Sequence, residues 1–88
     1  MILAPTPAAY PNPAQDQLTV NVYNPDEAEA TTLDLYDLNG KLLRQEAIQL
    51  QPGNNSYELD LSELNGGIYM LRLQRQSGIS VVKKVIKM

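Results

Sequence analysis

The chain has 88 residues, of which 43% are hydrophobic and 19% charged, and it contains neither cysteine nor histidine. This length predicts one small domain that buries about 60–65% of its extended-chain surface on folding. The missing residue types exclude disulfides, thiolate metal sites and the commonest general base. No run of about 18 apolar residues occurs, so we expect no membrane-spanning helix.

The net charge of −3 is unevenly distributed along the chain. Residues 1–63 carry all ten acidic residues and two basic ones, a net charge of −8, whereas residues 64–88 carry five basic residues and a net charge of +5. Two interpretations are open. Either the halves pair and neutralise each other, or the C-terminal half offers a basic face to a partner. Five cations without interleaved aromatic residues do not indicate a nucleic-acid interface.

The first nine residues are rich in proline and alanine and are expected to form a flexible linker from a larger chain. They lack the basic region and apolar run of a signal peptide. The folded domain is expected to comprise residues 10–88. It opens with Pro11 and Pro13, which impose a stiff, extended lead-in because proline has no amide donor and restricts its predecessor.

Alternating apolar and polar residues then predict a succession of β-strands. In the first strand, Leu18, Val20 and Val22 share one face, which is typical of a half-buried strand. In the second, Leu33 and Leu35 face inward. The predicted strands comprise residues 17–23, 31–38, 42–50, 56–61, 68–74 and 79–88, with a seventh if residues 11–14 pair at an edge.

Turn signals separate these strands. Asn39-Gly40 predicts a hairpin with two positive-φ residues in a type I′ turn. Residues 52–55, Pro-Gly-Asn-Asn, predict the next turn. Ser62 is expected to cap one helical turn, with Leu64 plugging the end of the core.

The turn spacing of about 8–12 residues predicts an all-β protein, an Ig-like antiparallel β-sandwich of about seven strands, with no helix longer than about two turns. The strand over residues 68–74 is the most hydrophobic and should be central, whereas the polar strand over residues 42–50 should be an edge. Leu35 and Leu71 are expected to be buried in facing sheets. The last strand has apolar residues on both sides, so its inward face stays undecided.

No catalytic, cofactor-binding or metal-binding motif is present, so we expect a domain that is not an enzyme and carries no cofactor. The candidate carboxylates do not have the spacing of a calcium loop, and turn formation explains Asp37 better than calcium does. The five tyrosines fit packing positions with hydrated hydroxyls better than a sugar-stacking platform. The candidate carboxylates are Asp34, Asp37, Asp60 and Glu63.

An ordered set of short motifs is more specific than any one of them. Together they resemble the type A C-terminal sorting domain of the type IX (Por) secretion system, and the resemblance covers residues 10–88. The motifs are Tyr10-Pro11-Asn12-Pro13-Ala14, Leu18-Thr19-Val20, Leu35-Tyr36-Asp37-Leu38-Asn39-Gly40-Lys41, Leu59-Asp60-Leu61-Ser62 with Leu64, Gly67-Ile68-Tyr69 and Lys84-Val85-Ile86-Lys87.

The resemblance implies a non-catalytic secretion signal at the end of a cargo protein. The cargo would pass through the periplasm, cross the outer membrane through the type IX translocon, and reach the cell surface or the medium of a Bacteroidota-type bacterium. A cell-surface sortase would remove the domain. The implied partners are the translocon, the sortase and the upstream cargo domain. The residues implied in recognition are Gly67, Tyr69, Lys84, Val85, Ile86 and Lys87.

Simpler roles for these residues stay open. For Gly67 and Tyr69, the alternative is a purely structural role in shaping the fold. For Lys84 and Lys87, the alternative is that they lie on a solvated edge. An edge strand with alternating lysines is also open to β-augmentation by a partner strand, while the lysines discourage self-pairing. The alternative for the whole domain is a passive Ig-like or carbohydrate-binding module of a secreted enzyme. A protease-inhibitor-like or catalytic domain is a weaker third class.

Overall fold

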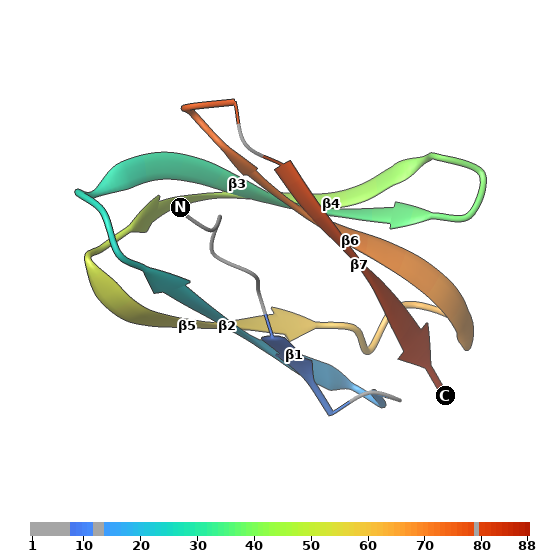
Figure 1. The fold of residues 1–88 in the computed structure, drawn as a ribbon. Helices are drawn as coiled ribbons and strands as arrows, with labels where there is room; N and C mark the ends of the chain where they lie inside the picture. Colours follow the sequence, from blue (N-terminus) through green and yellow to red (C-terminus); the bar gives the residue numbers. More distant parts are fainter. Residues whose placement is uncertain (1–7, 12–13, 79) are drawn as a thin grey trace.

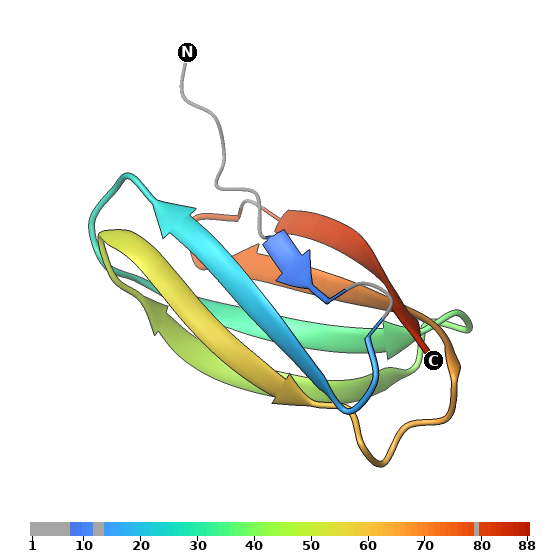
Figure 2. The same ribbon diagram turned by 90° about the horizontal axis from the view of Figure 1, so that it is seen from below.

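Two antiparallel β-sheets pack face to face in a computed structural model that describes residues 8–11, 14–78 and 80–88 (Figures 1 and 2). No helix occurs among these residues, and hence none of the length and apolarity needed to span a membrane. The strands are β1 (Ala8–Tyr10), β2 (Gln17–Asn24), β3 (Glu29–Asp37), β4 (Leu42–Leu50), β5 (Gly53–Asp60), β6 (Gly67–Arg75) and β7 (Ser80–Lys87).

The smaller sheet has the order β1-β2-β5 and the larger one the order β4-β3-β6-β7. The β3–β4 and β6–β7 pairs are hairpins, whereas β2 pairs with β5 after the chain has visited the other sheet. This arrangement confirms the predicted all-β, Ig-like sandwich of seven strands. It also confirms that β4 lies at an edge and that β6, between β3 and β7, is central.

The core lies between the sheets and follows the predicted alternation. Leu18, Val20 and Val22 of β2 are buried, because successive side chains on a strand point to opposite faces. One expectation was wrong: Leu35 and Leu71 are both buried, yet they are cross-strand neighbours in the same sheet. Alternation along a strand reveals which face is buried but not to which sheet the strand belongs.

The β3–β4 hairpin does not contain the predicted type I′ turn. Gly40 has a φ of 84°, but no described non-glycine residue has a positive φ, so Asn39 does not supply the second one. The Asp37 side-chain Oδ1 instead accepts the amides of Asn39 and Lys41 at 2.9 Å, and the strand register shifts between Leu35 and Tyr36. A glycine at positive φ followed by a bulge is a common three-residue hairpin.

The turn predicted over residues 52–55 is shorter in the structure. Strand β5 already begins at Gly53, whose φ is 92°, so Asn54 and Asn55 are strand residues. The Asn55 side chain bonds back to the amide and the carbonyl of Gln51 at 2.9 Å each. The asparagine therefore supports the turn from inside the strand.

A single turn follows β5, and Leu64 packs half-buried against the core as predicted. The capping residue is different, however. The Asp60 carboxylate accepts the Ser62 amide at 2.9 Å and also the Ser62 hydroxyl. Ser62 is therefore a donor to the cap and not the cap itself, since ionised aspartate only accepts hydrogen bonds.

The N-terminal boundary differs from the expected one. Ala8 and Ala9, expected in the linker, belong to β1 and pair with Asn21 and Val20 of β2. Residues 1–7 of the expected linker lie outside the described residues. The possible edge strand over residues 11–14 is reduced, in its described part, to one parallel bridge between Ala14 and Lys87, while Asn12 and Pro13 are not described.

Candidate functional site

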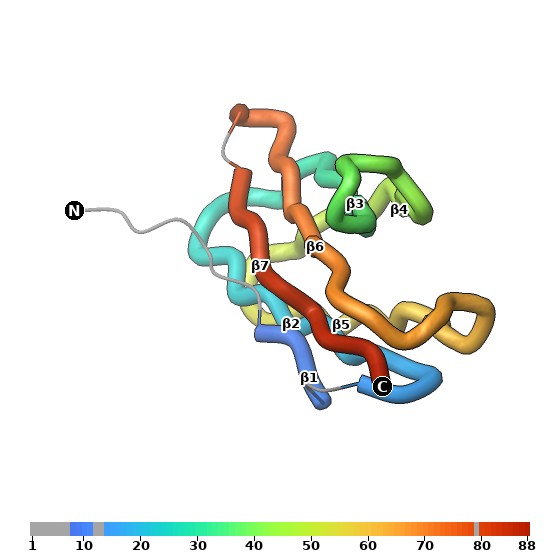
Figure 3. The backbone as a smooth tube through the Cα atoms, turned by 90° about the vertical axis from the view of Figure 1, so that its right-hand side faces the viewer, coloured from blue at the N-terminus to red at the C-terminus, as the bar shows by residue number. Residues whose placement is uncertain are grey.

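The structure brings the six expected recognition residues together at one end of β6 and β7. Gly67 lies opposite Lys87 and Tyr69 lies opposite Val85 in this antiparallel pair. Figure 3 shows the two strands side by side. We call this group, Gly67, Tyr69 and residues 84–87, the β6–β7 corner.

Two members of the corner belong to the core. Tyr69 and Val85 are buried, and the Tyr69 hydroxyl donates to the carbonyl of Asn65. The ring holds the turn before β6 against the sheet. A buried side chain does not meet a partner in the folded domain, so both residues shape the corner.

The inward face of β7, undecided from the sequence, is now defined. Val85 and Lys87 face the core, whereas Lys84 and Ile86 face outward. The alternative of a solvated edge is wrong for Lys87, which is only 8% exposed, whereas Lys84 is exposed. Lys87 is covered because Ala14 of the lead-in lies beside it.

The outer edge of β7 is partly occupied by the chain itself. The Ala14 amide donates to the carbonyl of Ile86 at 2.7 Å, and the Met88 amide donates to the carbonyl of Ala14 at 2.8 Å. A partner strand cannot use these backbone groups unless Ala14 is displaced. The expected β-augmentation is therefore blocked at this end of the folded domain.

The candidate carboxylates do not converge. Asp37 serves the hairpin turn, Asp60 serves the turn after β5, and Glu63 lies 3.7 Å from Arg44 at the surface. Asp34 is fully buried and forms an ion pair with Arg72 at 2.9 Å. Within the described residues, no group of three or more carboxylates is placed to hold a metal ion.

The tyrosines do not form a stacking platform. Tyr69 is buried, Tyr36 lies against Arg72 of the larger sheet, and Tyr23 is exposed on the smaller sheet. The Tyr10 hydroxyl accepts from Asn21 at 2.7 Å, and the Tyr57 hydroxyl donates to the carbonyl of Gln49 at 3.2 Å. These contacts agree with the packing interpretation.

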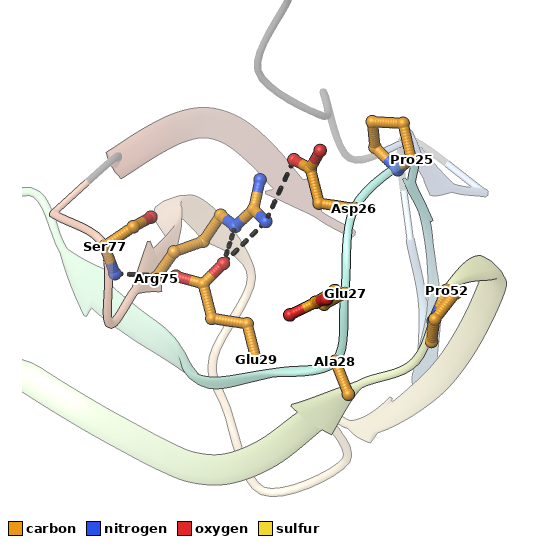
Figure 4. A pocket seen from close by; sticks show the side chains of 8 residues that line it. All are labelled: Pro25, Asp26, Glu27, Ala28, Glu29, Pro52, Arg75 and Ser77. Atoms are coloured by element: carbon orange, nitrogen blue, oxygen red, sulfur yellow. Dashed lines mark hydrogen bonds and ion pairs between the residues drawn. The ribbon is translucent and has the colours of Figure 1, made fainter.

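A polar cluster at the other end of β6 was not anticipated from the sequence. Arg75, only 4% exposed, donates from Nε to Glu29 Oε2 at 2.8 Å and lies 3.7 Å from Asp26. The buried Asn24 accepts from Arg75 at 3.3 Å, and Glu29 Oε1 accepts the Ser77 amide at 2.6 Å. Figure 4 shows Arg75 directed between Glu29 and Asp26.

This cluster joins the β2–β3 connection to the β6–β7 turn. Each charge in it is met by a partner within the domain, which is the usual condition for a buried arginine. With the Arg72–Asp34 pair, it shows that Arg72 and Arg75 of the basic half neutralise acids of the acidic half. The interpretation of mutual neutralisation is supported for these two residues.

The Glu29 carboxylate should make stability depend on pH. Hydrogen bonds from Ser77, and then the contacts with Arg75, hold the pKa of Glu29 below the ordinary value of 4.5. A carboxylate whose pKa is lower in the folded state stabilises the fold above its unfolded pKa and loses this contribution as the pH falls through its folded pKa. We therefore expect the urea midpoint to fall on acidification below about pH 4.5.

The variant Glu29→Gln should lose part of this acid dependence, measured as the difference in urea midpoint between pH 7 and pH 3. Glu58→Gln, at an exposed position of β5, is the matched control and should keep the full dependence. Equal acid dependence in both variants and the parent would show that Glu29 is not coupled to folding.

Comparison with known proteins assigns the chain to a family. The profile of the secretion system C-terminal sorting domain matches residues 8–88, beginning at the first residue of β1. No curated protein sequence matches the chain.

Two solved structures share the fold at identities that carry no functional inference. Dimeric latent PorU from Porphyromonas gingivalis is 20% identical with a TM-score of 0.81, over 96% of this chain and 9% of that chain. A β-glucosidase from Listeria innocua in complex with glucose is 15% identical with a TM-score of 0.52, over 94% and 16%. Because the profile spans all seven strands, the chain belongs to the family of C-terminal sorting domains of the Por (type IX) secretion system.

Proposed function

We propose that this domain carries an upstream cargo protein from the periplasm through the type IX translocon and is then removed by a sortase at the cell surface. As a member of its family, the domain is a C-terminal sorting signal for the type IX secretion system. The profile match over residues 8–88 is the observation that carries the proposal. A sorting signal is not itself catalytic. This statement concerns the domain and not the cargo protein.

The direction of the chain separates Ala8, which follows the proposed cargo, from the β6–β7 corner. Strand β1 runs antiparallel to β2, so Ala8 lies toward the end of β2 where Asn24 contacts the Arg75 cluster. The β6–β7 corner lies at the opposite end of β6 (Figure 2). A cargo attached before Ala8 would therefore leave the corner accessible to the secretion machinery.

The passive module explains the sandwich but not the family match. The likeness to a β-glucosidase concerns the fold alone, because the identity is 15%. The described residues also lack a clustered aromatic platform of the kind that binds sugars. The sorting signal is therefore the favoured function.

Export of a foreign reporter tests the proposal. The whole chain, fused behind a periplasmic reporter in a bacterium with a type IX system, should carry the reporter to the cell surface or the medium. The same fusion in a strain without the translocon should stay in the periplasm. An intact, folded fusion that remains periplasmic in the competent strain would contradict the sorting function, and retention on a polysaccharide gel would favour the module.

We further propose that the β6–β7 corner is read by the translocon or sortase, and Lys84 is the residue that tests this. An exposed lysine on a strand typically contributes within about 0.5 kcal/mol to stability, whereas it offers charge-assisted hydrogen bonds to an acidic partner. Lys84→Ala should thus lower reporter export while leaving the melting temperature nearly unchanged. Lys87→Ala should affect both, because Lys87 is buried.

Lys41→Ala, at an exposed position in the β3–β4 turn, is the matched control for the loss of one lysine. Removal of residues 84–88 should abolish export but does not separate signal from scaffold, since it also removes the buried Val85. Parental export of Lys84→Ala would mean that the recognition surface lies elsewhere.

A further inference from the structure

The dipeptide Asn-Gly occurs twice in the chain, as Asn39-Gly40 and as Asn65-Gly66, and a leucine precedes each pair. Both asparagines are exposed, Asn39 in the β3–β4 turn and Asn65 in the turn that leads into β6. An asparagine side chain reacts most easily with the next backbone nitrogen when that nitrogen belongs to glycine, which has no Cβ to hinder the approach. Because the local sequence and the access of solvent are matched, a difference in reactivity between the two pairs must come from the fold.

The fold holds the first pair in place. The Gly40 amide donates to the Asp37 carbonyl at 3.1 Å, and the Asp37 carboxylate accepts the amides of Asn39 and Lys41 at 2.9 Å each. For the Gly40 nitrogen to attack the Asn39 side chain, its own hydrogen bond must break and the peptide must rotate against the other two. The turn therefore raises the barrier to this reaction at Asn39.

The second pair leaves its backbone nitrogen available. In the part of the chain that the structure describes, the Gly66 amide has no hydrogen-bond partner, whereas the Asn65 carbonyl accepts from the Tyr69 hydroxyl. A hydrogen bond to a peptide carbonyl polarises the peptide and makes its N–H more acidic. Gly67 follows Gly66, so no side chain on this part of the backbone resists rotation. The peptide between Asn65 and Gly66 thus combines an available amide with a backbone that can adjust.

We propose that Asn65 is a site of spontaneous deamidation in the folded domain and that Asn39 is protected. The Gly66 nitrogen, after losing its proton to hydroxide, attacks Asn65 Cγ. The new N–Cγ bond closes a succinimide ring, and the side-chain nitrogen leaves as ammonia. Water then adds to one of the two ring carbonyls and breaks its bond to the ring nitrogen, which gives either aspartate or isoaspartate. The sum is one water consumed and one ammonia released, with no oxidation or reduction.

Deamidation at Asn65 changes the β6–β7 corner, because Gly67 of the corner lies only two positions further along the chain. Either product carries one additional negative charge. In isoaspartate the main chain runs through the former side chain, so the turn is one carbon longer and the oxygen that accepts from Tyr69 belongs to a free carboxylate. We expect the isoaspartate form to melt at a lower temperature than the parent. The modification does not depend on the proposed sorting function.

Peptide mapping of the purified whole chain by mass spectrometry, during incubation at mildly alkaline pH, measures the conversion of each asparagine. In the folded chain, we expect Asn65 to react about tenfold faster than Asn39. A tenfold ratio of rates corresponds to about 1.4 kcal/mol, which is the size of one hydrogen bond. In guanidinium chloride, which unfolds both turns, the two matched Leu-Asn-Gly sequences should react at similar rates. Equal rates in the folded chain, a faster reaction at Asn39, or the same ratio in both states would overturn the proposal.

Two variants test the chemistry at the second pair. Gly66 has no positive φ, and an added Cβ would meet backbone atoms of Lys87 and Met88 at 3.5 Å, an ordinary contact distance. Gly66→Ala should therefore slow the reaction at Asn65 by hindering the approach, with a nearly unchanged melting temperature. Asn65→Gln should abolish it, because the longer side chain has to close a less favourable six-membered ring. A parental rate in Gly66→Ala would overturn the role of the Gly66 nitrogen, and a parental melting temperature of the isolated isoaspartate form would overturn the expected loosening of the corner.

Discussion

Leu71→Ala is expected to destabilise the domain by about 2–5 kcal/mol, and Leu35→Ala by a similar amount. Both side chains are almost completely buried at the centre of the larger sheet. Truncation removes their transfer free energy and leaves a cavity that neighbouring strands fill only in part. Because small domains have a total stability of only about 5–15 kcal/mol, either change removes a large share of it.

The measurement is the free energy of unfolding in urea at pH 7. Val82→Ala, on the outward row of β7, is the matched control and should stay within about 0.5 kcal/mol of the parent. A midpoint for Leu71→Ala that hardly moves would show that the site collapses around the smaller side chain.

The double variant gives a sharper test of the architecture. Leu35 and Leu71 are directly opposite each other on β3 and β6, so the two truncations share one cavity. Mutations in contact are coupled, commonly by about 0.5–3 kcal/mol, whereas distant ones add. We expect the double variant to lose less than the sum of the single losses. Strict additivity would contradict the direct pairing.

The alternation of apolar and polar residues along a strand was sufficient to predict its buried face. The assignment of strands to the two sheets depended instead on which strands pair. Leu18, Val20 and Val22 were predicted correctly because a period of two identifies a buried face without knowledge of the neighbouring strand. The sheet that holds Leu35 and Leu71 depends instead on which strands pair. Strand β7 makes the same point, because its inward face followed only from the register of Tyr69 with Val85.

Aspartate side chains at the ends of β3 and β5 changed two local predictions. Asn39-Gly40 alone favours a type I′ turn, but the Asp37 carboxylate accepts two amides of the turn and holds a different geometry. Similarly, Asp60 competes with Ser62 for the role of cap. Aspartate two residues before a turn amide was the available signal in both places.

The candidate site was predictable as two segments but not as a surface. The motifs indicated Gly67, Tyr69 and residues 84–87, while the pairing of β6 with β7 was needed to join them. The burial of Lys87 could not be foreseen, because it depends on Ala14, which is 73 positions away in the sequence. The Arg75 cluster was missed for the same reason, since its acids lie near residues 24–29.

Arg72→Met is expected to cost about 3 kcal/mol, although Arg72 lies on the outer face of the sheet. The change leaves the fully buried Asp34 carboxylate without its cation, and an unpaired buried charge typically costs about 3–5 kcal/mol. The lower end of this range applies because the Arg72 side chain is one-third exposed, so water reaches the site. Methionine replaces the apolar stem of the arginine but not its guanidinium, which lies 5.0 Å from the centre of the Tyr36 ring.

Combining Arg72→Met with Asp34→Val should recover most of the loss, to within about 1 kcal/mol of the parent. Replacing both members of a buried ion pair with apolar residues removes the desolvation penalty together with the attraction, and such replacements are often neutral. The free energy of unfolding at pH 7 for the parent, the two single variants and the double variant forms a complete cycle. If the double variant is as unstable as Arg72→Met, the loss comes from the missing contact between the guanidinium and Tyr36 and not from the orphaned charge of Asp34.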